Sequence, residues 1–98
     1  MIRHCVMFRW REEMPVAWID DVETALATLP AAIPVIASYS FGRDIGVNAG
    51  NHQFAVVADF ATVDDYLVYR DHPVHKRVVA ELIVPNIAER SAVQFEMG

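Results

Sequence analysis

A short polar stretch, YRDHPVH at residues 69–75, holds a tyrosine, an aspartate and two of the four histidines of the chain. Neutral imidazole can take a proton near pH 7, and a phenol can donate a hydrogen bond to a carbonyl or enolate oxygen. These residue types therefore suit acid–base chemistry in a partly apolar pocket. The stretch also fits a junction between two helices, because a residue before proline avoids helical geometry and proline suits a first helical turn.

Some residues of this stretch fit a structural role and others fit a ligand pocket. In the structural one, His72 ends one helix and caps the next, Asp71 faces the free amides of that helix start, and Arg70 is solvated. His75 differs because it lies one helical turn beyond His72, where the helix turns toward a sheet. We expect His75 to line a ligand pocket, with Tyr69 of the preceding helix within reach.

A metal ion is a further hypothesis for the stretch. His72 and His75 stand at positions i and i+3, and Asp71 adds a carboxylate oxygen. The intervening proline, however, turns the two imidazoles differently, and no fourth ligand has a recognisable spacing. We predict no metal site here, and equilibrium dialysis against zinc or magnesium tests that prediction.

Composition excludes several classes of protein. At 98 residues, of which 54% are hydrophobic, the chain is long enough for one folded domain, residues 1–98, and too apolar to be disordered. No apolar run approaches the ~20 residues that span a bilayer. The net charge of −5 and the absence of a basic run argue against nucleic acid and anionic membranes as partners. The single Cys5 and the lack of a signal-peptide pattern indicate a cytoplasmic protein without disulfides.

Periodicity predicts the elements that must position these residues. Apolar and polar side chains alternate along residues 1–10, as in a strand, and apolar residues recur every three or four positions along 15–29, as in a helix. Further strands are expected at 35–41, 54–60 and 91–97, and further helices at 62–69 and 73–82, with Thr62 as an N-cap. The order β-α-β-β-α-α-β predicts an α+β, ferredoxin-like plait, a four-stranded antiparallel sheet with its helices on one face.

The opposite face of this sheet requires a cover of its own. Cys5 and Met7 point away from Val6 and Phe8 along the first strand, so both faces are substantially apolar. One layer of helices covers one face, and the other would expose a larger apolar patch than monomers usually keep. We predict a homodimer in which two sheets pack face to face into an α+β barrel.

Several segments resemble the stress-responsive dimeric A/B barrel family, abbreviated Dabb. They are MIRHCVMFRW, LPAAIPVIASYSFGRDI, FAVVADFATVDDYLVYRDHPVHKRVV and VQFE, which cover almost the whole chain. The most specific part is the order F-x-T/S-x5-6-Y-x2-H-P-x-H, matched by Phe60, Thr62, Tyr69, His72, Pro73 and His75, with a histidine on the first strand at His4. The resemblance implies the ferredoxin-like dimer and a small pocket between the sheet and the helices.

The resemblance implies less about the reaction. Most members have no assigned activity, and a plant branch of polyketide cyclases performs an intramolecular aldol closure. Resemblance to that branch implies His75 as the catalytic base and Tyr69 as the catalytic hydrogen-bond donor. The ligand-pocket residues expected beside them are His4, His72, Tyr66 and Trp18. Core packing is the competing use of the aromatic residues Trp18, Tyr39, Phe41 and Tyr66.

Three hypotheses of function stay open. The first is a dimeric domain of unassigned biochemical role whose pocket binds a small aromatic or carbonyl ligand. The second is a polyketide-cyclase-like enzyme that uses His75 and Tyr69 without a cofactor. The third is a cofactor-free monooxygenase of the related dimeric barrel superfamily, although nothing in the sequence marks the use of oxygen. The substitution His75→Ala separates a pocket residue from a structural one.

Overall fold

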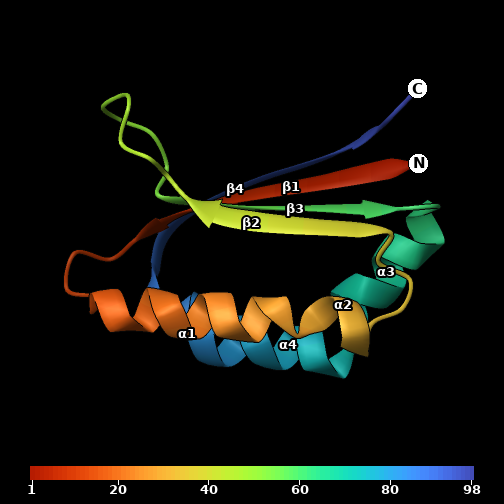
Figure 1. Ribbon diagram of the computed structural model, residues 1–98, viewed down its shortest axis with the longest axis horizontal. Helices are drawn as coiled ribbons and strands as arrows, with labels where there is room; N and C mark the ends of the chain where they lie inside the picture. The colour runs from red at the N-terminus through yellow and green to blue at the C-terminus, as the bar shows by residue number, and fades with distance from the viewer.

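A four-stranded antiparallel sheet with its helices on one face makes up the fold (Figure 1), which the computed structural model describes over residues 1–98. The strands are β1 (Ile2–Trp10), β2 (Ser38–Arg43), β3 (Phe54–Phe60) and β4 (Ile87–Glu96), in the spatial order β2-β3-β1-β4. The helical elements are α1 (Val16–Ala27), α2 (Leu29–Ala32), α3 (Val63–Asp71), α4 (Pro73–Val78), the π-helical turn η1 (Val79–Ile83) and the 3₁₀ turn η2 (Val84–Asn86). The predicted ferredoxin-like plait is confirmed.

The largest differences from the expected boundaries lie after α1 and at the starts of β2 and β4. The helical region does not end at residue 29, because Pro30 lies in the first turn of α2, where a missing amide proton costs no helical hydrogen bond. Strand β2 consequently begins at Ser38 instead of residue 35. Strand β4 begins at Ile87, four residues before the expected position, since the chain passes directly from η2 into pairing with β1.

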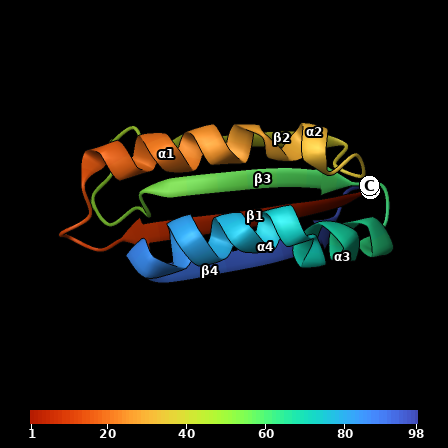
Figure 2. The same cartoon turned by 90° about the horizontal axis from the view of Figure 1, so that it is seen from below.

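The core lies between the sheet and the helical layer. Val6, Phe8 and Trp10 of β1 face the helices and are buried, as the alternation along residues 1–10 predicts. Figure 2 shows α1 running along the β2 and β3 side of the sheet and α4 along the β1 and β4 side. The largest fully buried side chains are Phe54, Phe60, Leu29, Ile33 and Val22.

The face of the sheet without helices carries apolar side chains in the open. Val93 of β4 lies opposite Cys5 of β1, and Met7, Val93 and Phe95 are 43%, 55% and 45% exposed. Asp59 is buried on the same face, where it accepts two hydrogen bonds from Arg3 at 2.8 and 3.0 Å. In the single chain this face is therefore an uncovered apolar surface that also carries the Arg3–Asp59 ion pair.

The helix junction at YRDHPVH follows local rules. Helix α3 begins where the Thr62 hydroxyl accepts the amide of Asp65, which confirms the predicted N-cap. At the next helix start, His72 Nδ1 accepts the amide of Val74 at 3.1 Å. Asp71 does not face those amides, because Arg70 holds both of its carboxylate oxygens. No helix in the chain combines the length and the apolar character needed to cross a bilayer.

Candidate functional site

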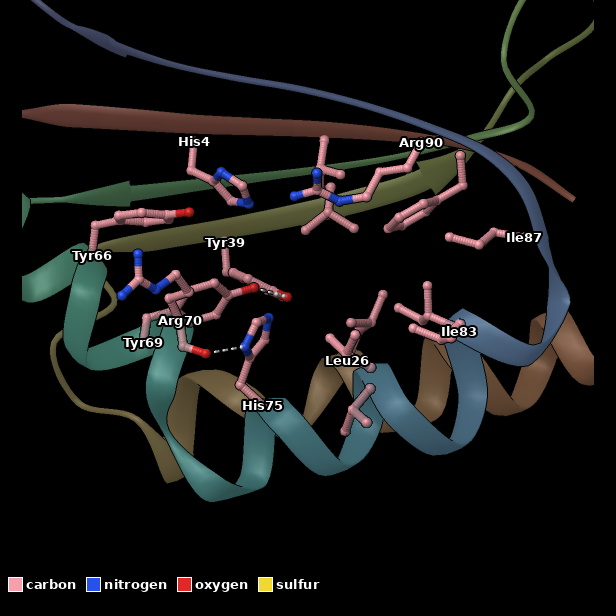
Figure 3. A pocket seen from close by; sticks show the side chains of 16 residues that line it. His4, Leu26, Tyr39, Tyr66, Tyr69, Arg70, His75, Ile83, Ile87 and Arg90 are labelled. Carbon is pink, nitrogen blue, oxygen red and sulfur yellow. Dashed lines mark hydrogen bonds between the residues drawn. The ribbon is translucent and has the colours of Figure 1, made fainter.

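A cavity of about 180 Å³ opens between the sheet and the helices (Figure 3). All four strands contribute side chains to it, together with α1, α3, α4 and the turns that follow α4. Hydrophobic side chains form most of the wall. The polar lining consists of His4, Tyr39, Tyr66, Tyr69 and His75, with the exposed arginines Arg70 and Arg90.

His75 points from α4 toward the sheet, and its hydrogen bond sets its chemistry. Nδ1 lies 3.0 Å from the carbonyl oxygen of Arg70. Because a carbonyl oxygen only accepts, Nδ1 carries the proton, and Nε2 keeps a free lone pair. Burial lowers the pKa of His75, although the bond to Arg70 opposes this effect. The imidazole is therefore a neutral base near pH 7.

His4, on β1, presents the complementary tautomer. Its Nδ1 lies 2.8 Å from the amide nitrogen of Gln94 on β4, which only donates, so the proton of His4 resides on Nε2. Burial and then the positive charge of Arg90 lower the pKa of His4 to about 4. The cavity thus contains one neutral imidazole that accepts a proton and one that donates a hydrogen bond.

Three tyrosines pack around the two imidazoles. The ring centroid of Tyr69 lies 4.2 Å from that of His75, and the ring centroid of Tyr66 lies 5.1 Å from that of His4. The hydroxyls of Tyr39 and Tyr69 are 3.2 Å apart. Burial, followed by the interaction with Tyr69, raises the pKa of Tyr39, and burial also raises the pKa of Tyr69. Both phenols therefore keep their protons at neutral pH and act as hydrogen-bond donors.

Two of the expected pocket residues lie outside the cavity lining. The indole nitrogen of Trp18 donates to the carbonyl oxygen of Leu82 at 2.8 Å, which fixes the ring against the end of η1. The imidazole of His72 serves the start of α4 through Val74. The structure thus brings His4, Tyr66, Tyr69 and His75 together around the cavity, whereas Trp18 and His72 make structural contacts outside it.

Two polar residues of the site are missing from the sequence-based prediction. Arg90 and Gln94 lie on β4 and share the face that points toward the helices, since they pair with Phe8 and His4 of β1. A strand that begins at residue 91, as the pattern indicates, leaves Arg90 outside it. The signal in the sequence is the alternation of side chains along the last strand: extended back toward Pro85, it places Arg90 on the cavity side.

The side chains considered as metal ligands do not form a cluster. The chain contains no group of three or more His, Cys, Asp or Glu side chains placed to hold a metal ion. Asp71 is paired with Arg70, and the Nδ1 atoms of His72 and His75 contact separate backbone groups.

Comparisons with known proteins agree with this architecture. The family model described as Stress responsive A/B Barrel Domain matches residues 2–97. Among curated proteins none matches the chain. A dimeric ferredoxin-like protein of unknown function from Thermobifida fusca shares 47% sequence identity over 98% of this chain and 90% of its own, with a TM-score of 0.91.

Two further solved structures are more distant. A dimeric protein of unknown function with a ferredoxin-like fold from Bacteroides fragilis is 27% identical over 98% of this chain and 95% of its own, with a TM-score of 0.85. A hydroxynitrile lyase from Passiflora edulis is 20% identical over 99% of this chain and 93% of its own, with a TM-score of 0.87. The likeness to the lyase concerns the fold alone.

Proposed function

The chain belongs to the stress responsive A/B barrel domain family, and from this premise we propose that its cavity binds a small aromatic or carbonyl compound and moves a proton on it. The observation that carries the proposal is the arrangement of His75. Its Nδ1 proton is engaged by the Arg70 carbonyl, so the basic Nε2 is available in a mostly apolar cavity that Tyr69 also lines.

The proposed step is the removal of a proton beside a carbonyl group. Nε2 of His75 takes the proton from carbon, and the electron pair of the broken C–H bond moves onto the carbonyl oxygen as an enolate. The two hydroxyls are 3.2 Å apart and either can donate; we assign Tyr39 as the donor, which leaves the proton of Tyr69 to hydrogen-bond that oxygen. An aldol closure or a lyase step begins in this way, and His75, once protonated, returns the proton at its end.

We propose that the protein works as a homodimer joined through the uncovered face of its sheet. The relatives from Thermobifida fusca and Bacteroides fragilis are dimeric, and the exposed Met7, Val93 and Phe95 form an apolar surface of the kind that a second copy buries. Light scattering at micromolar concentration should give twice the chain mass, and a monomeric mass would refute the dimer.

We also propose a cytoplasmic location. Cys5, the single cysteine, is a free and half-buried thiol on β1, which suits a reducing compartment. Fractionation of the host cell tests this, and recovery in a secreted or membrane fraction would contradict it.

Deuterium exchange into acetophenone tests the catalytic step directly. This neutral aromatic ketone exchanges its methyl protons slowly in D₂O, and a positioned base accelerates such a transfer by about 10²–10⁴-fold. We expect exchange catalysed by the wild-type dimer and a loss of about a hundredfold in His75→Ala.

The matched control is His52→Ala, since His52 lies outside the cavity beside Ser91 and Glu89. Exchange should be unchanged in this variant. Equal loss in both variants, or no catalysis by the wild type, would refute proton transfer by His75. Ring signals of His4 and His75 that shift on ligand addition without exchange would reduce the protein to a binding domain.

A further inference from the structure

The cavity has an unbalanced electrostatic character. Its lining contains two arginines and no aspartate or glutamate, although the whole chain has a net charge of −5. Arg70 is neutralised locally, because its guanidinium donates to both carboxylate oxygens of Asp71 at 2.9 and 3.1 Å. Arg90 takes part in none of the ion pairs of the chain, so its five donors are open to solvent or to a ligand.

The position of Arg90 in the sheet directs this free charge into the cavity. Arg90 pairs with Phe8 of β1, and Phe8 points toward the helices, so Arg90 shares that face of the sheet. Figure 3 shows its side chain reaching into the cavity on the side of His4. The positive charge of Arg90 also acts on the two imidazoles, because it contributes to the lowered pKa of both His4 and His75.

We infer that the ligand of this cavity is an aromatic compound with one carboxylate, and that Arg90 binds the carboxylate. The inference deepens the proposed function and rests on it for the role of the cavity. A guanidinium offers two parallel N–H donors that match the two oxygens of a carboxylate. The apolar wall and the volume of about 180 Å³ suit a single aromatic ring, while His75 and Tyr69 remain available to the reacting carbonyl.

The test compares benzoate with benzamide, which has nearly the same shape and no charge. Binding to the wild-type protein is followed by NMR through the ring signals of His4 and His75. Since Arg90 is exposed and its charge is partly screened, we expect benzoate to bind about five- to tenfold more tightly than benzamide. In Arg90→Gln the two affinities should differ by less than about twofold, with the benzamide affinity unchanged.

Arg77→Gln is the matched control, because Arg77 is an exposed arginine that lies outside the cavity. It should preserve the preference for benzoate. Equal affinities in the wild type, or a preference that survives Arg90→Gln, would overturn the inference. If the same protein still catalyses acetophenone exchange, the proposed function stands without the anion site. A benzoate preference that depends on Arg90 in a protein without acetophenone exchange would keep the anion site and refute the proposed reaction. If neither compound binds, the inference is overturned.

Discussion

The hydroxyl oxygens of Tyr39 and Tyr69 lie 3.2 Å apart, so strand β2 and helix α3 meet through one hydrogen bond inside the cavity. One of the two phenolic protons is used within the pair, and the other is left for a ligand. The ring of Tyr69 also packs against His75. Tyr69 therefore contacts both the hydroxyl of Tyr39 and the imidazole of His75, the proposed base.

Removal of the two hydroxyls should have unequal effects. We expect Tyr69→Phe to slow acetophenone exchange by about 10–100-fold, because it deletes the donor nearest to His75. Tyr39→Phe should slow exchange by less than about fivefold, since Tyr69 keeps its own proton. Initial exchange rates measure both. A larger effect of Tyr39→Phe would assign the free proton to Tyr39.

Acid should destabilise the protein through His4. Its pKa is about 4 in the folded chain and 6.5 in the unfolded chain, so the unfolded state binds the proton first as pH falls. The stability that neutral His4 contributes is complete above pH 6.5 and is lost between pH 6.5 and about 4. Allowing for solvent in the cavity, we expect a loss of about 2 kcal/mol, measured by urea unfolding at neutral pH and at about pH 4.5.

His4→Gln is the comparison for this pH dependence. The variant should lose about 2 kcal/mol less than the wild type over the same interval. Asp59 does not disturb the measurement, because Arg3, followed by Ser38, lowers its pKa to about 2, and its contribution is lost at more acidic pH. Equal acid sensitivity in both proteins would show that His4 titrates normally.

The two histidines of YRDHPVH should separate structure from ligand binding. His72→Ala removes the N-cap of α4 and should cost about 1 kcal/mol of unfolding free energy without changing benzoate affinity. His75→Ala should lower acetophenone exchange by about a hundredfold at a small cost in stability. Urea unfolding and ligand titration of both variants give the comparison. Loss of ligand binding in His72→Ala at unchanged stability would show that His72 binds the ligand.

A charge on the uncovered sheet face should split the dimer. Val93→Glu places a carboxylate in the proposed interface and should shift the light-scattering mass toward the monomer. Val63→Glu is a close control, because Val63 is as exposed as Val93, at 55%, and lies at the start of α3. A dimer that survives Val93→Glu and dissociates in Val63→Glu would place the interface on the helical side.

Interactions between residues close in the chain determine much of this fold. Alternation along residues 1–10 identifies the buried face of β1, and Thr62 marks the start of α3. The Asp71-His-Pro stretch places the helix junction and the cap at His72, because proline restricts its own backbone and that of its neighbour. Each of these features depends on residues a few positions apart, so the sequence alone suffices to predict it.

Long-range register and packing decided the site. His4 obtains its tautomer from Gln94, 90 residues away, and Arg90 reaches the cavity because β4 begins earlier than its own pattern indicated. The indole nitrogen of Trp18, which we expected to line the ligand pocket, donates its hydrogen bond to the carbonyl oxygen of Leu82. Such contacts depend on how strands align and helices pack, and a shift of one residue in a strand sends every side chain to the opposite face. The sequence determined which groups were available for chemistry, and the tertiary structure decided which of them meet.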